Sequence, residues 1–170
     1  SFDMVFSRLI SLIKLLFIKD KELYVYVHSI SGYYPGDIEL YKLALVHRSK
    51  PVQLPDGRWA NNERLEFLGD AVLELYVSEA LYRKFPDEPE GKLTRMRADL
   101  VCEASLSEAL RRLDLQKFTR LSVGETRSGG QDKPSIQCDI LESIIGAIYL
   151  DGGFAPVHTH DRSRRFGHVG

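Results

Sequence analysis

The amino-acid sequence predicts an all-α fold, and two segments carry most of that prediction. Residues 62–85 hold an apolar stripe at helical spacing, and residues 135–150 are apolar almost all round, as expected of a buried helix. The chain has 170 residues, which is long enough to bury one core. The stripe consists of Leu65, Leu68, Val72 and Leu75.

The N-terminal part predicts shorter elements. Residues 5–18 are apolar, but charged residues interrupt them, and they fall short of the about 20 residues that a membrane span needs. We therefore expect an amphipathic helix packed on the domain or on a partner subunit, and no membrane anchor. Residues 21–30 fit either a short strand or a helix. Asp37 is an N-cap candidate for a helix that we expect to end at residues 47–49.

Turn signals separate the remaining elements. We expect loops at residues 51–59 and 123–134, where proline, glycine and polar residues gather. The helix from residue 62 should end at about residue 85, because Pro86 follows it. The last helix should end at a glycine C-cap, and the aperiodic residues 157–170 should form a disordered tail. The other helices are expected at about residues 90–100, 103–113 and 135–150.

Charge and cysteine content narrow the class of protein. The net charge is −1, so any binding of nucleic acid must depend on local basic patches or on bound cations. The two cysteines, Cys102 and Cys138, are too few for a disulfide framework. We interpret both as small buried hydrophobic residues in a reducing compartment.

Acidic residues form a line on the helix over residues 62–85. Glu63, Glu66 and Asp70 lie on one side of it, opposite the apolar stripe. A charged face is usually only solvated, and that interpretation stays open for this helix. Two features favour a site instead: like charges along one line repel each other, and Phe67 lies among them, where a solvated face would not place an aromatic.

The helix over residues 135–150 carries a second acidic pair, Asp139 and Glu142, on a narrow polar stripe. Burying two carboxylates costs several kcal/mol unless cations compensate them. Salt bridges could do so, and so could Mg²⁺, which favours all-oxygen ligands. Pairing this stripe with Glu66 and Asp70 would give a four-carboxylate site suited to metal-dependent phosphodiester hydrolysis. The candidate salt-bridge cations are Lys92, Arg95 and Arg97.

Three weaker candidates rank below this site. His158, His160 and His168 lie in the aperiodic tail, where a metal site is not expected. We interpret His47 as a structural cap. The pair Gly129-Gly130 indicates a flexible loop rather than a phosphate cradle.

Four ordered motifs closely resemble those of the ribonuclease III family. They are LALVHRS (43–49), NNERLEFLGDAVL (61–73), GKLTRMRADLV (91–101) and SGG…DILESIIGAIYLDGGF (128–154). The resemblance implies an all-helical, homodimeric endonuclease domain that cuts double-stranded RNA with Mg²⁺, or with Mn²⁺ as a substitute. It further implies 5′-phosphate and 3′-hydroxyl ends with short 3′ overhangs, and processing of rRNA and mRNA precursors in the cytoplasm.

The resemblance also assigns roles by position. It implies metal ligands at Glu66, Asp70, Asp139 and Glu142, of which Asp70 and Glu142 are the most closely tied to catalysis. Glu63 matches an acidic position at the substrate edge of the site, and Phe67 matches the aromatic that inserts into the partner subunit.

Domain boundaries and two departures from the family pattern follow from the same motifs. We expect an N-terminal helical segment over residues 1–36, the catalytic domain over 37–156 and the tail over 157–170. Ser143 stands where the family often has alanine. The family's C-terminal double-stranded-RNA-binding domain has no counterpart here, so we expect weak, salt-dependent RNA affinity. A catalytically silent RNA-binding or ribosome-associated protein is the alternative, but silent members lose carboxylates that this chain keeps.

Overall fold

The computed structural model describes residues 21–32 and 34–152. Two compact units make up the chain: residues 39–150, and residues 1–38 together with 151–170. The helix expected over residues 5–18 and the tail expected over 157–170 lie outside the described residues. Within the described part, the all-α prediction is confirmed, with one small hairpin added.

In the smaller unit, residues 21–30 are helical rather than extended. Helix α2 (Lys21–Ser31) buries side chains at helical spacing, which settles the alternative left open by the sequence. The imidazole of His28 stacks on the ring of Tyr34, with 3.9 Å between the ring centroids. The backbone amides of Gly36 and Asp37 both donate to the carboxylate of Asp151, at 2.9 and 2.8 Å.

Helix α3 (Ile38–Ala44) starts after Asp37 as expected but ends earlier than residues 47–49. The prediction of a longer helix was wrong because the backbone after Ala44 bonds to a distant segment. The amide of His47 donates to the carbonyl of Arg120 at 3.0 Å, and the amide of Arg120 donates to the carbonyl of Leu45 at 2.8 Å. This pairing extends the chain and turns His47 toward the interior.

Two expected loops contain regular structure. Residues 51–59 belong to an antiparallel hairpin, in which β1 (Val52–Gln53) pairs with β2 (Trp59–Ala60). Residues 123–134 hold the short helix α7 (Val123–Arg127) and the 3₁₀ turn η2 (Gly130–Asp132). The hydroxyl of Ser122 caps α7 by accepting from the amide of Glu125 at 3.1 Å. Both elements are too short for apolar periodicity to mark them.

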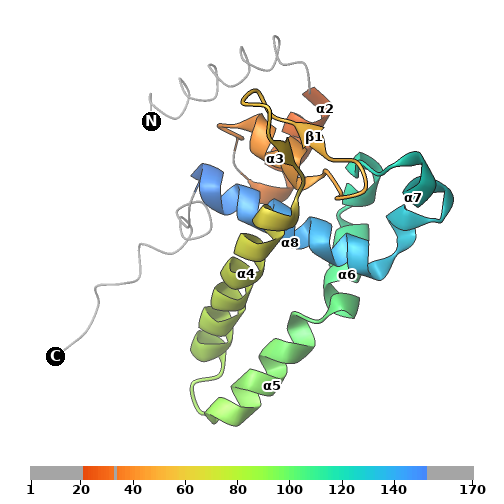
Figure 1. The fold of residues 1–170 in the computed structure, drawn as a ribbon. Coiled ribbons are helices and arrows are strands. Elements are labelled where there is room, and N and C mark those ends of the chain that lie inside the picture. The colour runs from red at the N-terminus through yellow and green to blue at the C-terminus, as the bar shows by residue number, and fades with distance from the viewer. Residues whose placement is uncertain (1–20, 33, 153–170) are drawn as a thin grey trace, which may run out of the picture. The chain divides into compact units, whose positions relative to one another are not determined.

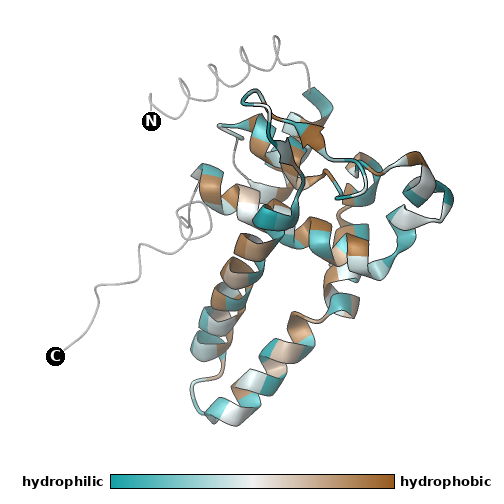
Figure 2. Ribbon diagram, viewed as in Figure 1, coloured by the Kyte–Doolittle hydropathy of each residue, from teal (hydrophilic) through white to brown (hydrophobic). Residues whose placement is uncertain are grey.

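The long helices agree with the sequence to within one or two residues. They are α4 (Glu63–Lys84), α5 (Glu90–Leu100), α6 (Glu103–Arg112) and α8 (Pro134–Gly152), with the 3₁₀ turn η1 (Leu115–Phe118) after α6. Hydrophobic residues dominate α8, whereas α5 mixes polar and apolar residues (Figure 2). Helix α8 accordingly lies in the core, and buried side chains surround it. The largest fully buried hydrophobic side chains of residues 39–150 are Tyr41, Leu110, Leu115, Ile140 and Ile144.

Helices α4 and α5 run antiparallel and extend together away from the other elements of residues 39–150 (Figure 1). Leu65 and Val72 of the predicted stripe are buried, but Leu75 is 56% exposed. The stripe therefore enters the core only as far as Val72, because past Val72 the described chain offers α4 mainly α5 to pack against. Helix α5 itself has no buried residue. In the described part of the chain, no helix is both long and apolar enough to cross a membrane.

Candidate metal centre

Helices α4 and α8 cross with their backbones in contact, and two glycines permit this. A Cβ atom at Gly69 would lie 1.7 Å from the backbone oxygen of Glu142, and one at Gly146 would lie 2.3 Å from the backbone oxygen of Leu65. No side chain fits at either position. The close crossing therefore brings the polar stripes of the two helices to the same place.

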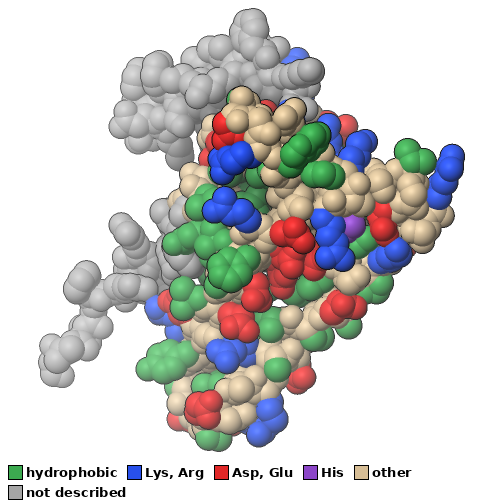
Figure 3. Space-filling view, in the orientation of Figure 1, with side chains coloured by type: hydrophobic (Ala, Val, Ile, Leu, Met, Phe, Trp, Pro, Cys, Tyr) green, Lys and Arg blue, Asp and Glu red, His purple; other side chains and the backbone are tan. Residues whose placement is uncertain are grey.

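An open cavity of about 480 Å³ lies beside this crossing. It is lined by all four carboxylates that the sequence singled out, together with Glu63 and Phe67. Acidic side chains gather on this part of the surface (Figure 3). The structure thus assembles the residues that were expected to meet, while their catalytic and metal-binding roles stay predictions. The four carboxylates are Glu66, Asp70, Asp139 and Glu142.

Three of these carboxylates are partly buried, and burial makes their ionisation less favourable than in water. Desolvation, followed by repulsion from Asp70 and Glu66, raises the pKa of Glu142 to about 7. Desolvation is also the main cause that raises the pKa of Glu66 and of Asp139. A cavity in which carboxylates resist ionisation is one that a bound cation would relieve.

The protein supplies little positive charge to this cavity. Arg48 lines it and lowers the pKa of Asp139, but its guanidinium lies 3.9 Å from the carboxylate of Glu63, at the exposed rim. The salt-bridge alternative predicted Lys92, Arg95 or Arg97 as partners. Lys92 instead pairs with Glu88 at 2.5 Å, and Arg97 donates to the hydroxyl of Ser78 at 2.9 Å.

Across residues 21–32 and 34–152, no ion pair involves any of the four carboxylates. Compensation of the acidic pair by salt bridges is therefore wrong for the part of the chain that the structure describes. The donor set fits a hard divalent cation, because carboxylate oxygens from two rigid helices face one open cavity. Glu66, Asp70, Asp139 and Glu142 are the residues that would hold it.

Polar contacts fix the register of the crossing. The hydroxyl of Ser143 is buried, donates to the carbonyl of Asp139 at 2.7 Å and lies 3.2 Å from the carbonyl of Asn62. The side-chain amide of Asn62 donates to the carbonyl of Ala44 at 3.3 Å, and its backbone amide donates to Val46 at 2.8 Å. Serine in place of alanine at position 143 is accommodated, because its hydroxyl has a partner.

The start of α4 orients Glu63. The side-chain amide of Asn61 donates to the Glu63 carboxylate at 2.8 Å, and its side-chain oxygen accepts from the Glu63 amide at 2.9 Å. These bonds hold Glu63 at the rim of the cavity, where it is exposed.

Three further residues line the cavity without having been predicted there: His47, Arg48 and Asn62. The Nδ1 atom of His47 accepts the amide hydrogen of Ser49 at 3.1 Å, so the neutral ring carries its proton on Nε2. Burial lowers the pKa of His47. Its contact with Ser49 agrees with a structural role, but its position at the acidic cavity was not predicted. The LALVHRS motif was the available signal.

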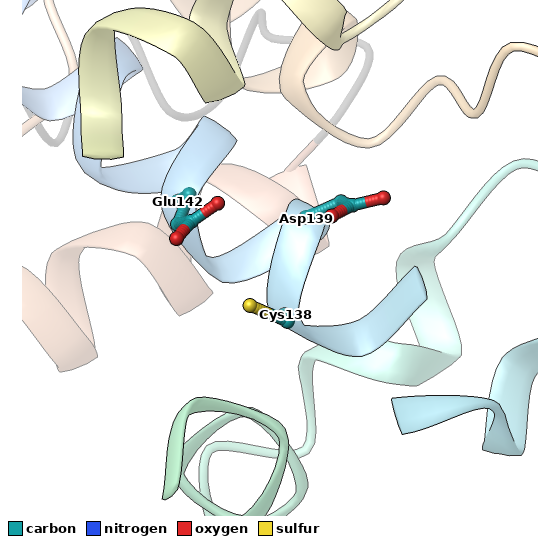
Figure 4. Close-up of side chains that lie close together, drawn as sticks. All are labelled: Cys138, Asp139 and Glu142. Carbon is teal, nitrogen blue, oxygen red and sulfur yellow. The ribbon is translucent and has the colours of Figure 1, made fainter. Parts of the chain in front are cut away.

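The two cysteines differ from their prediction as buried hydrophobic residues. Cys102 is exposed, because it is the N-terminal flanking residue of α6, and its sulfur lies 3.2 Å from the hydroxyl of Ser105. Cys138 lies beside the candidate centre (Figure 4). Its sulfur and carboxylate oxygens of Asp139 and Glu142 all lie within 4.8 Å of one another.

Exposed apolar side chains continue from the cavity along α4. Phe67 is 82% exposed, Leu75 56% and Tyr82 74%. At helical spacing, these three residues fall within about 80° of arc around the α4 axis. An apolar face of this kind on a folded chain marks an interaction surface.

The histidines at 158, 160 and 168 lie outside the described residues.

Known proteins are similar to this chain in sequence and in fold. A sequence model of the family described as Ribonuclease-III-like matches residues 37–163. Ribonuclease 3 of Listeria monocytogenes serotype 4a is 48% identical over 123 residues, which cover 72% of this chain and 54% of that protein. Ribonuclease 3 of Desulforamulus reducens is 54% identical over 110 residues, which cover 65% of this chain and 45% of that protein.

Solved structures agree with these relatives. The nuclease domain of ribonuclease III from Campylobacter jejuni is 44% identical with a TM-score of 0.69, and the match covers 78% of this chain and 90% of that one. Dicer from Pichia stipitis is 33% identical with a TM-score of 0.53, over 71% of this chain and 49% of that one. The chain spans about half the length of the curated relatives it matches.

Proposed function

Because this chain belongs to the ribonuclease III-like family, we propose that it is an endonuclease that hydrolyses double-stranded RNA at the cavity between α4 and α8. The observation that carries the proposal is the meeting of four carboxylates, two from each helix, around one open cavity, with none of the four in an ion pair with a described residue. Such a site repels an RNA backbone unless a divalent cation occupies it.

Each part of the cavity has a role in this proposal. Glu66, Asp70, Asp139 and Glu142 hold Mg²⁺, for which Mn²⁺ can substitute. When bound, the cation supplies the acidity that activates a water molecule and the positive charge that offsets the phosphate. Glu63, at the rim beside Arg48, helps to bind the RNA or the metal from the edge of the site.

We propose that Asp70 and Glu142 are the residues on which hydrolysis depends most. Asp70 is exposed to the approaching substrate, whereas Glu142 lies deeper. The pKa of Glu142 is about 7 in the metal-free cavity, so this carboxyl would gain strongly from a bound cation.

The active form in this proposal is a homodimer. The exposed apolar face of α4 is formed by Phe67, Leu75 and Tyr82. Association with a second copy of the chain would bury this face in a symmetric interface. A structure of the Campylobacter jejuni nuclease domain is described in terms of a region involved in dimer formation. Phe67 is the residue that we expect to insert into the partner.

The products and setting are proposed by analogy with the family. Two sites in one dimer would cut the two strands and leave 5′-phosphate and 3′-hydroxyl ends with short 3′ overhangs. Precursors of rRNA and mRNA in the cytoplasm are the proposed substrates.

The test is cleavage of a labelled RNA duplex and of its separate strands, with and without Mg²⁺. We expect cleavage of the duplex only, and only with the cation. Asp70→Asn and Glu142→Gln should each lower the rate at least about 100-fold while circular dichroism stays unchanged. Glu74→Gln is the matched control, because Glu74 is an exposed acid of α4 outside the cavity.

Two results would contradict the proposal. Near-normal turnover by Glu142→Gln at saturating Mg²⁺ would remove the carboxylate assignment. A wild-type protein that binds duplex RNA but never cuts it would instead be a catalytically silent member of the family.

A further inference from the structure

Cys138 adds a soft ligand to a centre that otherwise offers only hard oxygens. It lies one helical turn before Glu142 and next to Asp139 on α8, and Figure 4 shows Glu142 and Cys138 on one side of the helix and Asp139 pointing to the other. Their candidate ligand atoms lie within 4.8 Å of one another.

The chemistry of this trio differs from that of the four-carboxylate set. Mg²⁺ prefers oxygen ligands and gains nothing from sulfur. Zn²⁺ and Cd²⁺ bind thiolate strongly, and zinc accepts Cys sulfur together with carboxylate oxygens in tetrahedral sites. One sulfur and two carboxylate oxygens from a single rigid helix provide three such ligands, and a water molecule can supply the fourth.

We propose that Cys138, Asp139 and Glu142 form an inhibitory site for a soft divalent cation, Zn²⁺ in particular. Binding displaces the thiol proton of Cys138 to solvent and forms a metal–sulfur bond. The same event occupies Asp139 and Glu142, which the hard cation needs. Zn²⁺ therefore competes with Mg²⁺ at this centre. The inhibitory consequence, but not the binding itself, rests on the proposed function.

The first experiment measures binding without activity. Metal-free protein is titrated with Cd²⁺, and the thiolate-to-cadmium charge-transfer absorption is recorded for the wild type, Cys138→Ser and Cys102→Ser. Cys102 is the matched control, because it is the chain's other cysteine and has no carboxylate partner in the described cluster. We expect the band to reach its maximum at one equivalent in the wild type and Cys102→Ser, and to vanish in Cys138→Ser.

A second variant tests the oxygen ligands. Glu142→Gln keeps the thiol and removes one carboxylate, so the cadmium band should persist while the affinity falls about 10-fold or more. An unchanged affinity would reduce the site to a thiol alone and overturn the proposal. So would a stoichiometric band that depends on Cys102 instead of Cys138.

The second experiment measures inhibition. Duplex RNA cleavage in excess Mg²⁺ is titrated with Zn²⁺, each variant being compared with its own uninhibited rate. The concentration for half inhibition should rise about 10-fold or more in Cys138→Ser and stay constant in Cys102→Ser. Equal inhibition of both variants would overturn the inhibitory role. If no form cleaves RNA, the proposed function fails, while the cadmium band still decides whether the site exists.

Discussion

The pKa of Glu142 is raised strongly, and the surroundings of this side chain in the cavity explain why. It projects from a helix whose other faces are buried, and three further carboxylates lie around the same cavity. Desolvation and the repulsion from Asp70 and Glu66 raise its pKa from an ordinary value of 4.5 to about 7. In the metal-free protein, the folded state therefore holds a proton that the unfolded chain has already released.

This difference predicts a pH dependence of stability. Between about pH 4.5 and 7, the folded state binds more protons than the unfolded state, so the free energy of unfolding falls as pH rises. The side chain in Glu142→Gln cannot ionise. Above pH 7 we therefore expect the free energy of unfolding of this variant to exceed that of the wild type by about 1–2 kcal/mol, a figure reduced for partial solvent exposure. Urea unfolding in chelator across this range measures it.

The control for that measurement is Glu74→Gln, which removes an exposed acid of the same helix pair outside the cavity. Its curve should run parallel to that of the wild type. Parallel curves for Glu142→Gln as well would mean that Glu142 ionises normally in the folded protein.

At the scale of single residues, the sequence predicted the acidic side chains well and their neighbours poorly. Helical periodicity places Glu66 and Asp70 on one line and Asp139 and Glu142 on another, and the family motifs bring the two lines together. His47 lines the cavity, and the sulfur of Cys138 lies within 4.8 Å of carboxylate oxygens of Asp139 and Glu142, but neither position could be predicted by pattern. His47 reaches it through a backbone pairing with Arg120 that leaves no periodic signal.

At the scale of elements, the crossing of α4 and α8 decides the geometry of the site. Gly69 lies three residues after Glu66 and directly before Asp70, and Gly146 lies one turn after Glu142. Any side chain at these glycines would push one backbone off the other and separate the acidic pairs. The site therefore depends on two residues that carry no functional group.

A substitution at the crossing tests this dependence. In Gly69→Ala, the new Cβ would lie 1.7 Å from the backbone oxygen of Glu142. This clash is with the backbone, so no side chain can move to relieve it. We expect a loss of about 3 kcal/mol or more of unfolding free energy, and a loss of cleavage because the carboxylates separate. Gly124→Ala in α7 is the control: no atom lies within 4 Å of its Cβ, so it should be neutral or stabilising by up to about 1 kcal/mol. Equal stability of the two variants would show that the helices cross less closely.

Element prediction succeeded where helices are long and failed where they are short. Proline and glycine at the ends of α4 and α8 mark their boundaries to within one or two residues. Helix α7 and the β1–β2 hairpin are too brief for a hydrophobic period to appear. The length of α3 was overestimated because the pairing of Val46 with Arg120 is a tertiary contact.

At the scale of the whole molecule, the exposed face of α4 predicts assembly. Phe67→Ala should weaken dimer association by about 2–4 kcal/mol, the scale of a buried aromatic hot spot, while leaving the monomer fold intact because the side chain is 82% exposed. Sedimentation equilibrium measures the association. Trp59→Ala, which removes another exposed aromatic away from α4, should associate normally. A wild-type chain that remains monomeric at micromolar concentration would refute the predicted dimer.

Binding of the cation should couple to the stability of the whole folded chain. Carboxylates that resist ionisation without a cation become favourable ligands when one binds, and a ligand that binds only the folded state stabilises it by mass action. At about 100 times its dissociation constant, Mg²⁺ should add about 2.7 kcal/mol to the free energy of unfolding. The melting temperature should therefore rise with Mg²⁺, and should rise less in Asp139→Asn, which removes one oxygen charge from the set.

General screening of the acidic cavity by salt would also raise the melting temperature, so the comparison needs a matched ionic strength of a monovalent salt. Specific binding predicts a rise with Mg²⁺ well beyond that control. Ca²⁺ should stabilise the fold through the same oxygens while supporting little hydrolysis, because its coordination is larger and less regular. If the melting temperature stays flat up to several times the Mg²⁺ concentration that saturates cleavage, these carboxylates are not the ligands of the catalytic ion.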